Sequence, residues 1–136
     1  MRRALVLAIL VVPLVLEACT TYCTLVGCAS TVEMCVPLAT TTHLRVCRNS
    51  TCSEVLYSPA ESYVTNALGP ISQYDGCVSV EPPTDGENGD VFTVTGWDAD
   101  GNVVDDYRWT ATYTPYYPNG ERCGPECQRA TLTDAP

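Results

Sequence analysis

The chain of 136 residues contains no lysine, and all seven of its basic residues are arginine. Sixteen acidic residues outweigh them, so the formal net charge is −9 at pH 7. Nucleic acid is bound through clustered cations that neutralise phosphates, and this composition therefore argues against a nucleic-acid partner. The same deficit of positive charge argues against electrostatic attachment to anionic lipid.

Histidine is nearly absent as well, since His43 is the only one. A serine or cysteine nucleophile would need it as a general base, yet there is no G-x-S-x-G motif, and its alternation with Leu44 predicts that His43 faces solvent. No C-x-x-C spacing occurs, which removes the motif of thioredoxin-like redox catalysts. We therefore predict no catalytic residue, no cofactor and no enzymatic activity.

A long apolar run occurs only at the N-terminus, from Ala4 to Leu16, directly after Arg2 and Arg3. A positive start, a short apolar run and a small residue at Ala18 are the layout of a signal peptide. The run is shorter than the roughly 20 apolar residues of a membrane-spanning helix. We predict a signal peptide over residues 1–18.

Leu16-Glu17-Ala18-Cys19 resembles the lipobox of bacterial lipoproteins, a Leu, an aliphatic or small residue, a small residue and a Cys. Three of the four positions match, and Glu17 departs from the pattern. The resemblance implies cleavage after Ala18 and a lipid on Cys19, so that the protein is anchored to a membrane without spanning it. Thr20 stands where an Asp is associated with inner-membrane retention, which by resemblance implies the outer membrane of the cell envelope.

Nine cysteines are far more than a cytosolic chain of this size carries without a metal, and they indicate a disulfide-rich exported domain. Setting Cys19 aside for the lipid leaves eight, enough for four disulfides. Eight cysteines allow about a hundred pairings, so the connectivity stays open. A four-thiolate zinc site is the weaker interpretation in an oxidising compartment. The eight disulfide candidates are Cys23, Cys28, Cys35, Cys47, Cys52, Cys77, Cys123 and Cys127.

Residues 42–57 show the pattern of a β-hairpin with its turn at residues 48–51. The four loop residues place Cys47 and Cys52 opposite each other. Facing residues of antiparallel strands have Cα atoms about 4.5 to 5.5 Å apart, a separation that a disulfide can bridge. We predict this one pair, against the alternative that each cysteine reaches a different strand.

A second hairpin is predicted from the period-two alternation of Tyr107, Trp109, Ala111 and Tyr113 with polar residues. Its partner strand is 91–97, and residues 98–102 form the turn. Further strands are expected at 77–80 and 130–133. Residues 58–75 are expected to form a loop with one helical turn over 60–66, and residues 81–90 a solvated loop.

Six or seven short strands with almost no helical periodicity predict an all-β fold, an antiparallel β-sandwich of immunoglobulin-like architecture stapled by disulfides. Residues 19–136 are expected to form this single domain. Trp97 or Trp109 is expected to pack against a disulfide in its core.

Two groups of residues are weak candidates for binding. Asp98 and Asp100 offer oxygen ligands for calcium, but Gly101 follows the second Asp directly and the glutamate of an EF-hand loop is missing. We therefore favour a plain turn and predict no metal. Tyr116 and Tyr117 lie between prolines in a loop that would suit recognition of a partner.

The C-terminal run Tyr117-Pro118-Asn119-Gly120, followed by Cys123, Pro125 and Cys127, resembles the ending of small uncharacterised bacterial envelope lipoproteins. The resemblance implies a disulfide-clamped loop before the last strand and no particular activity. The resulting hypothesis is a lipid-anchored, non-enzymatic binding or structural module with a protein partner in the envelope. The alternative is a secreted disulfide-stapled effector or inhibitor, and a hydrolase ranks third.

Overall fold

The computed structural model describes residues 27–58, 60, 62–74 and 76–133. The predicted signal peptide, Cys19 and Cys23 lie outside these residues. The described part contains ten strands and no helix, and so none that is long and apolar enough to cross a membrane. The strands are β1 (Thr31–Cys35), β2 (His43–Arg48), β3 (Thr51–Leu56), β4 (Ser62–Asn66), β5 (Gly69–Tyr74), β6 (Cys77–Val80), β7 (Val91–Trp97), β8 (Val103–Thr110), β9 (Thr114–Tyr116) and β10 (Cys127–Thr133).

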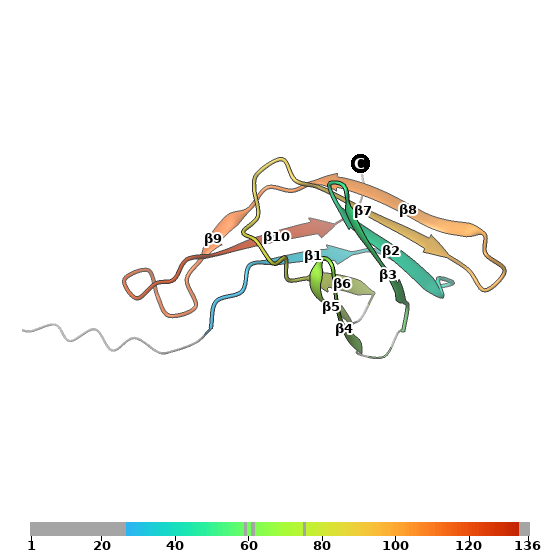
Figure 1. Ribbon diagram of the computed structural model, residues 1–136, viewed down its shortest axis with the longest axis horizontal. Coiled ribbons are helices and arrows are strands. Elements are labelled where there is room, and N and C mark those ends of the chain that lie inside the picture. The colour runs from blue at the N-terminus through green and yellow to red at the C-terminus, as the bar shows by residue number, and fades with distance from the viewer. Residues whose placement is uncertain (1–26, 59, 61, 75, 134–136) are drawn as a thin grey trace, which may run out of the picture.

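These strands form two sheets, which confirms the all-β prediction (Figure 1). The larger sheet has the order β4-β5-β6-β1-β10-β9, and the smaller one has the order β3-β2-β7-β8. Neighbouring strands are antiparallel except β1 and β10, which run parallel. Because these two strands are distant in the sequence, the parallel pair joins the two ends of the domain.

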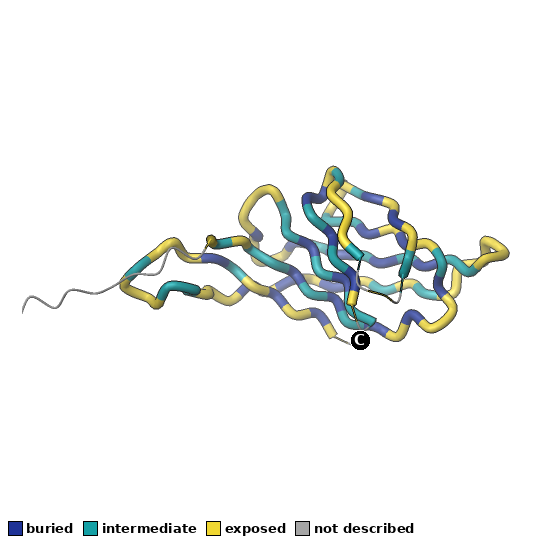
Figure 2. The backbone as a smooth tube through the Cα atoms, turned by 90° about the horizontal axis from the view of Figure 1, so that it is seen from below, coloured by how far each residue is buried: buried dark blue, intermediate teal, exposed yellow. Residues whose placement is uncertain are grey.

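The inner faces of the two sheets share one hydrophobic core (Figure 2). Alternate residues of β1, β2, β6 and β7 point into it, as the period of two dictates. Phe92, Met34, Leu44 and Ile71 are among the largest side chains that are fully buried. Trp109 is the tryptophan of the core, where it stacks on Tyr107 with the ring centroids 5.6 Å apart.

Two polar bridges connect the sheets across this core. The fully buried Gln73 of β5 donates to the carbonyl of Leu56 at 3.1 Å and accepts from the backbone N–H of Ser58 at 3.1 Å. Ser53 of β3 donates to the side-chain oxygen of Asn66 in β4 at 2.7 Å. These hydrogen bonds offset the cost of burying the polar groups, and they also connect the two sheets.

Both predicted hairpins are present, and their strands run close to the expected residues. Cys47 and Cys52 are in register on β2 and β3 and are joined by a disulfide, as predicted. The turn between them contains only Asn49 and Ser50, so it is shorter than expected. Asn49 adopts the left-handed conformation that such a turn requires, with φ of 53°.

The prediction of a loop with a helical turn over residues 58–75 is wrong, because β4 and β5 form a third hairpin there. β4 lies at the edge of its sheet with mostly exposed side chains, so its sequence shows no alternation of apolar and polar residues. Gly69 makes the tight turn with φ of +90°, and a Cβ there would come within 2.2 Å of the Glu81 carbonyl oxygen. The strands β1 and β9 were also not predicted.

Three disulfides link six of the seven described cysteines: Cys28–Cys127, Cys35–Cys77 and Cys47–Cys52. Cys35–Cys77 and Cys47–Cys52 join paired strands of one sheet, and Cys28–Cys127 joins the segment before β1 to β10. None of the three is therefore an inter-sheet disulfide of the immunoglobulin kind. The immunoglobulin-like arrangement is therefore not confirmed. Cys123 is disulfide-bonded as well. Disulfides persist in oxidising compartments, and this set is consistent with an exported protein.

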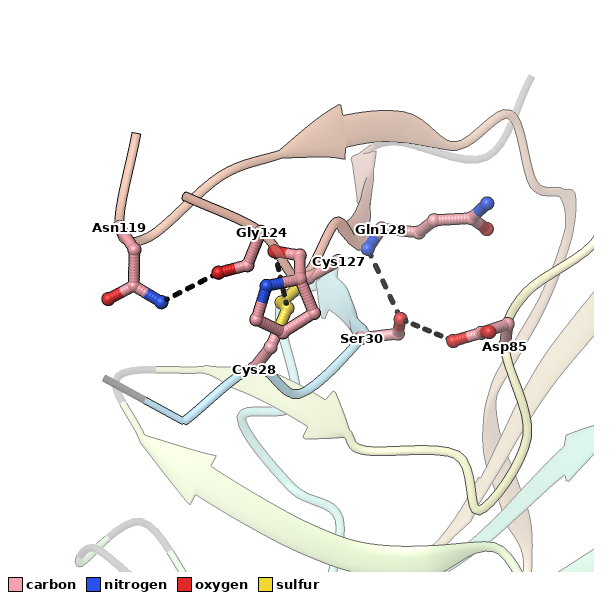
Figure 3. Close-up of a disulfide and its surroundings, with 8 residues drawn as sticks. Cys28, Ser30, Asp85, Asn119, Gly124, Cys127 and Gln128 are labelled. Carbon is pink, nitrogen blue, oxygen red and sulfur yellow. Dashed lines mark hydrogen bonds between the residues drawn. A yellow bond between two sulfur atoms is a disulfide. The ribbon is translucent and has the colours of Figure 1, made fainter. Parts of the chain in front are cut away.

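The segment before β1 is fastened to the start of β10 (Figure 3). Besides the Cys28–Cys127 disulfide, Ser30 accepts a hydrogen bond from the backbone N–H of Gln128 at 3.1 Å. The same Ser30 hydroxyl donates to Asp85 at 3.2 Å, which connects this point to the loop of residues 81–90. These contacts fix where the chain enters the domain.

The three disulfides close loops of very different length, with sequence separations of 99, 42 and 5. We predict that replacing each pair by serine lowers the free energy of unfolding by about 4.7, 4 and 2 kcal/mol respectively, because a longer closed loop restricts the unfolded chain more. Urea unfolding without reductant measures this order. An equal loss in all three double variants would contradict the loop-entropy explanation.

Candidate functional site

The outer face of the four-stranded sheet carries a row of side chains near the β7–β8 turn. In register across β3, β2, β7 and β8, the row consists of Leu56, His43, Trp97 and Val103. Leu56 is 68% exposed and Val103 is 57% exposed. We call these four residues the distal row.

A β-bulge places the β8 end of the distal row. The register shifts between Gly96 and Trp97, so that Gly96 lies opposite Asp105 while Trp97 lies opposite Val103. Thr41 packs against Gly96, where a Cβ would come within 2.7 Å of its hydroxyl oxygen, and that hydroxyl donates to Asp105. Bulges bend a strand and redirect its side chains, so a glycine at position 96 is part of how the site is built.

The turn beside the distal row is held by Asp98. Its carboxylate accepts hydrogen bonds from the backbone N–H of Asp100 at 3.0 Å, and from both the backbone N–H and the side-chain amide of Asn102 at 2.8 and 3.0 Å. These bonds, chiefly those of Asn102, lower the pKa of Asp98, which is therefore an anion at neutral pH. The two calcium candidates thus lie in a turn where Asp98 already serves N–H donors.

An open pocket of about 320 Å³, which we call the distal pocket, adjoins the distal row. It brings together an indole, an imidazole and two carboxylates. Its lining contains no serine or cysteine, so the nucleophile that His43 would have to activate does not come from this pocket. Such a set of groups can hold a cation against an aromatic face. The lining residues are His43, Glu54, Trp97, Asp98, Ala99 and Gly101.

Of the two acidic residues, Glu54 has the weaker interactions within the domain. Its side chain is 75% exposed, and its ion pair with Arg45 has an N–O distance of 3.9 Å. An exposed pair of this length contributes little, about 0 to 1 kcal/mol. Glu54 can therefore turn toward another cation without a large loss of stability.

No protein-family model, curated protein or solved structure matches the chain. The distal row and its pocket are therefore identified as a candidate binding site from their geometry.

The two tyrosines predicted as a binding loop lie elsewhere and have partners within the domain. Tyr116 ends β9, and the Arg129 guanidinium lies 4.6 Å from its ring centroid. The Tyr117 hydroxyl donates to Glu126 at 2.7 Å, and this hydrogen bond raises the pKa of Tyr117. Neither tyrosine lines the pocket. Of the residues discussed from the sequence as candidates, His43, Trp97 and Asp98 do line it.

Only one group of metal-ligating side chains gathers within the described residues: Glu33, Cys35 and Cys77. The two cysteines are bonded to each other, so they offer no thiolates. The Glu33 carboxylate accepts the hydroxyl of Tyr74, and this hydrogen bond raises the pKa of Tyr74 to about 12. The group is therefore structural.

A second, more polar pocket surrounds Arg48 near the β2–β3 turn. Its guanidinium lies 2.8 Å from Asp90 and also donates to the carbonyls of Thr84 and Asp85. Both members of the ion pair are largely buried, and Asn49 donates to the same Asp90 carboxylate. These bonds connect the loop of residues 81–90 to the β2–β3 turn. We therefore assign this group of residues a structural role and call it the latch.

Asp90 is the centre of this latch. Burial alone would raise its pKa, but the hydrogen bonds from Asn49, from the backbone N–H of Glu87 and from Arg48 outweigh burial and lower it. The folded-state pKa is thus below the unfolded value of about 3.9. The charge therefore stabilises the fold above about pH 4, and this stabilisation disappears as the pH falls through the folded-state pKa.

We expect Asp90→Asn to lower the free energy of unfolding by about 3 kcal/mol at pH 7, because it leaves the buried Arg48 without its countercharge. The loss should shrink as the pH falls below about 4, where Asp90 of the unfolded wild-type chain takes up a proton, and it should be smallest below the folded-state pKa, where native Asp90 is protonated as well. Chemical denaturation at several pH values measures both effects. The control Asp100→Asn, at an exposed turn position, should change stability by less than about 0.5 kcal/mol. A pH-independent loss would rule out the electrostatic latch.

Proposed function

We propose that this protein is a lipid-anchored lipoprotein of the bacterial cell envelope and acts as a non-enzymatic binding module. The observation that carries the proposal is the state of its cysteines. Six of those described pair with one another, and Cys123 is also disulfide-bonded. The lipobox motif favours Cys19 for the lipid, and we therefore infer that Cys23, the remaining cysteine, is the partner of Cys123.

The arrangement of the domain supports an anchor at this end. Cys28 follows Cys19 by nine residue steps, which span at most about 30 Å. The first described residues and the β9–β10 loop lie at one end of the long axis, and the β7–β8 turn lies at the other (Figure 1). A lipid on Cys19 would thus hold the domain close to the bilayer with the distal row turned away from it.

A binding role is favoured over catalysis by the composition of the distal pocket. The pocket contains carboxylates and an indole, and the distal row beside it adds the exposed apolar side chains of Leu56 and Val103, so that together they have the groups of a recognition surface. A protein held at the membrane with this surface outermost is suited to meet a partner in the envelope. The outer membrane remains the proposed location in a cell that has one.

The anchor is tested by comparing Cys19→Ser with Cys23→Ser. We predict that Cys19→Ser removes the lipid mass from the mature protein and moves it from the detergent fraction to the soluble fraction. Cys23→Ser should keep the lipid, but the mass difference between reduced and non-reduced protein should fall from eight hydrogens to six, since one of four disulfides is lost. Intact mass spectrometry and membrane fractionation measure these outcomes.

An unmodified Cys19 in the soluble fraction of cells making the wild-type protein would contradict the lipoprotein proposal. That result would favour the secreted effector or inhibitor instead. A lipid found on Cys23 would contradict the assignment of the two N-terminal cysteines.

A further inference from the structure

We propose that the distal pocket binds a lysine or arginine side chain of a partner polypeptide, while the apolar neighbours of that side chain pack on the distal row. This inference rests on the proposed binding role and names the chemistry of the partner. It is carried by three features of the described residues: an exposed apolar row, a pocket with an aromatic face and carboxylates, and the sign of the surrounding charge.

The apolar part of the contact comes from the distal row. Leu56 and Val103 lie at its two ends, on the edge strands β3 and β8, and are more than half exposed. Four neighbouring strands about 4.8 Å apart make the row about 14 Å wide, the span of about four residues of an extended peptide. The row can therefore accept apolar side chains on both sides of a central residue.

In the proposed complex, the central residue of the peptide faces Trp97, which is half-buried and lines the pocket from β7. A cation over an indole ring is attracted to its negative face, and the acidic residues Glu54 and Asp98 line the same pocket. Asp98 contributes a fixed negative charge, because its carboxylate is held by the N–H groups of the turn. Glu54 is 75% exposed and has only a long ion pair, so its carboxylate is free to contact the ligand directly. Together they favour a guanidinium or ammonium group.

The charges around the pocket also favour a cationic ligand. Asp100 and Asp106 add negative charge to the turn and the neighbouring strand, and Arg45 is the basic residue of the adjacent row. The chain as a whole has a net charge of −9. This field attracts a basic partner and repels acidic ones, including an anionic bilayer surface.

The test uses the full-length protein purified in a non-ionic detergent and three capped peptides. The first has the sequence Gly-Leu-Arg-Leu-Gly, and the others carry citrulline or glutamate in place of arginine. Citrulline keeps the shape of arginine but lacks its charge. Tryptophan fluorescence and calorimetric titration report binding. We expect the arginine peptide to bind about tenfold more tightly than the citrulline peptide, the glutamate peptide to show no binding, and 0.5 M NaCl to weaken the complex.

Two pairs of variants locate the site. Trp97→Ala should weaken binding of the arginine peptide about tenfold, and Glu54→Gln about threefold. Their matched controls are Tyr63→Ala, an exposed aromatic residue of β4, and Glu121→Gln, an exposed acid of the β9–β10 loop. Both controls should leave the affinity within twofold of the wild type. Circular dichroism confirms that all four variants are folded.

Equal binding of the arginine and citrulline peptides would overturn the inference, because the surface would then recognise apolar groups alone. Binding of a chito-oligosaccharide in place of the arginine peptide would overturn it in favour of a glycan. These results are independent of the anchor. If the protein carries the lipid but does not bind the arginine peptide, only the inference is refuted. If the protein is soluble and unmodified but binds the peptide, only the lipoprotein proposal is refuted.

Discussion

Burial of one face of each sheet against the other is the constraint on which this structure depends. Alternate residues of the central strands enter the shared core, where Phe92, Met34 and Leu44 are fully buried. Because successive side chains of a strand point to opposite faces, every inward residue leaves its neighbours outside. The core therefore determines which residues form the two outer surfaces, and the distal row is one consequence of that requirement.

Cross-links reinforce the core where a small domain buries little apolar surface. The disulfides act within the sheets, Gln73 acts between them, and the latch around Asp90 holds the long loop of residues 81–90. The end with the β7–β8 turn is held by the bulge at Gly96 and by Asp98, so its outer face is left accessible to a partner.

The predictions succeeded where a pattern was local. The hairpins of β2–β3 and β7–β8 were recognised because one face of each was apolar, and the Cys47–Cys52 pair followed from the short turn between its cysteines. They failed for β4 because an exposed edge strand has no apolar face to alternate with its polar one. The three-residue strand β9 is too short to show a period at all.

The sequence by itself determined the all-β class, the acidic character and the export hypothesis, since these depend on composition and on short-range patterns. Tertiary structure decided which cysteines pair at long range, the parallel union of β1 with β10, and the meeting of Leu56, His43 and Trp97 on one surface. The reason is physical: strand register is set by packing between segments far apart in the chain. A shift of one residue in any of these strands would have turned that strand's outward side chains, including its member of the distal row, into the core.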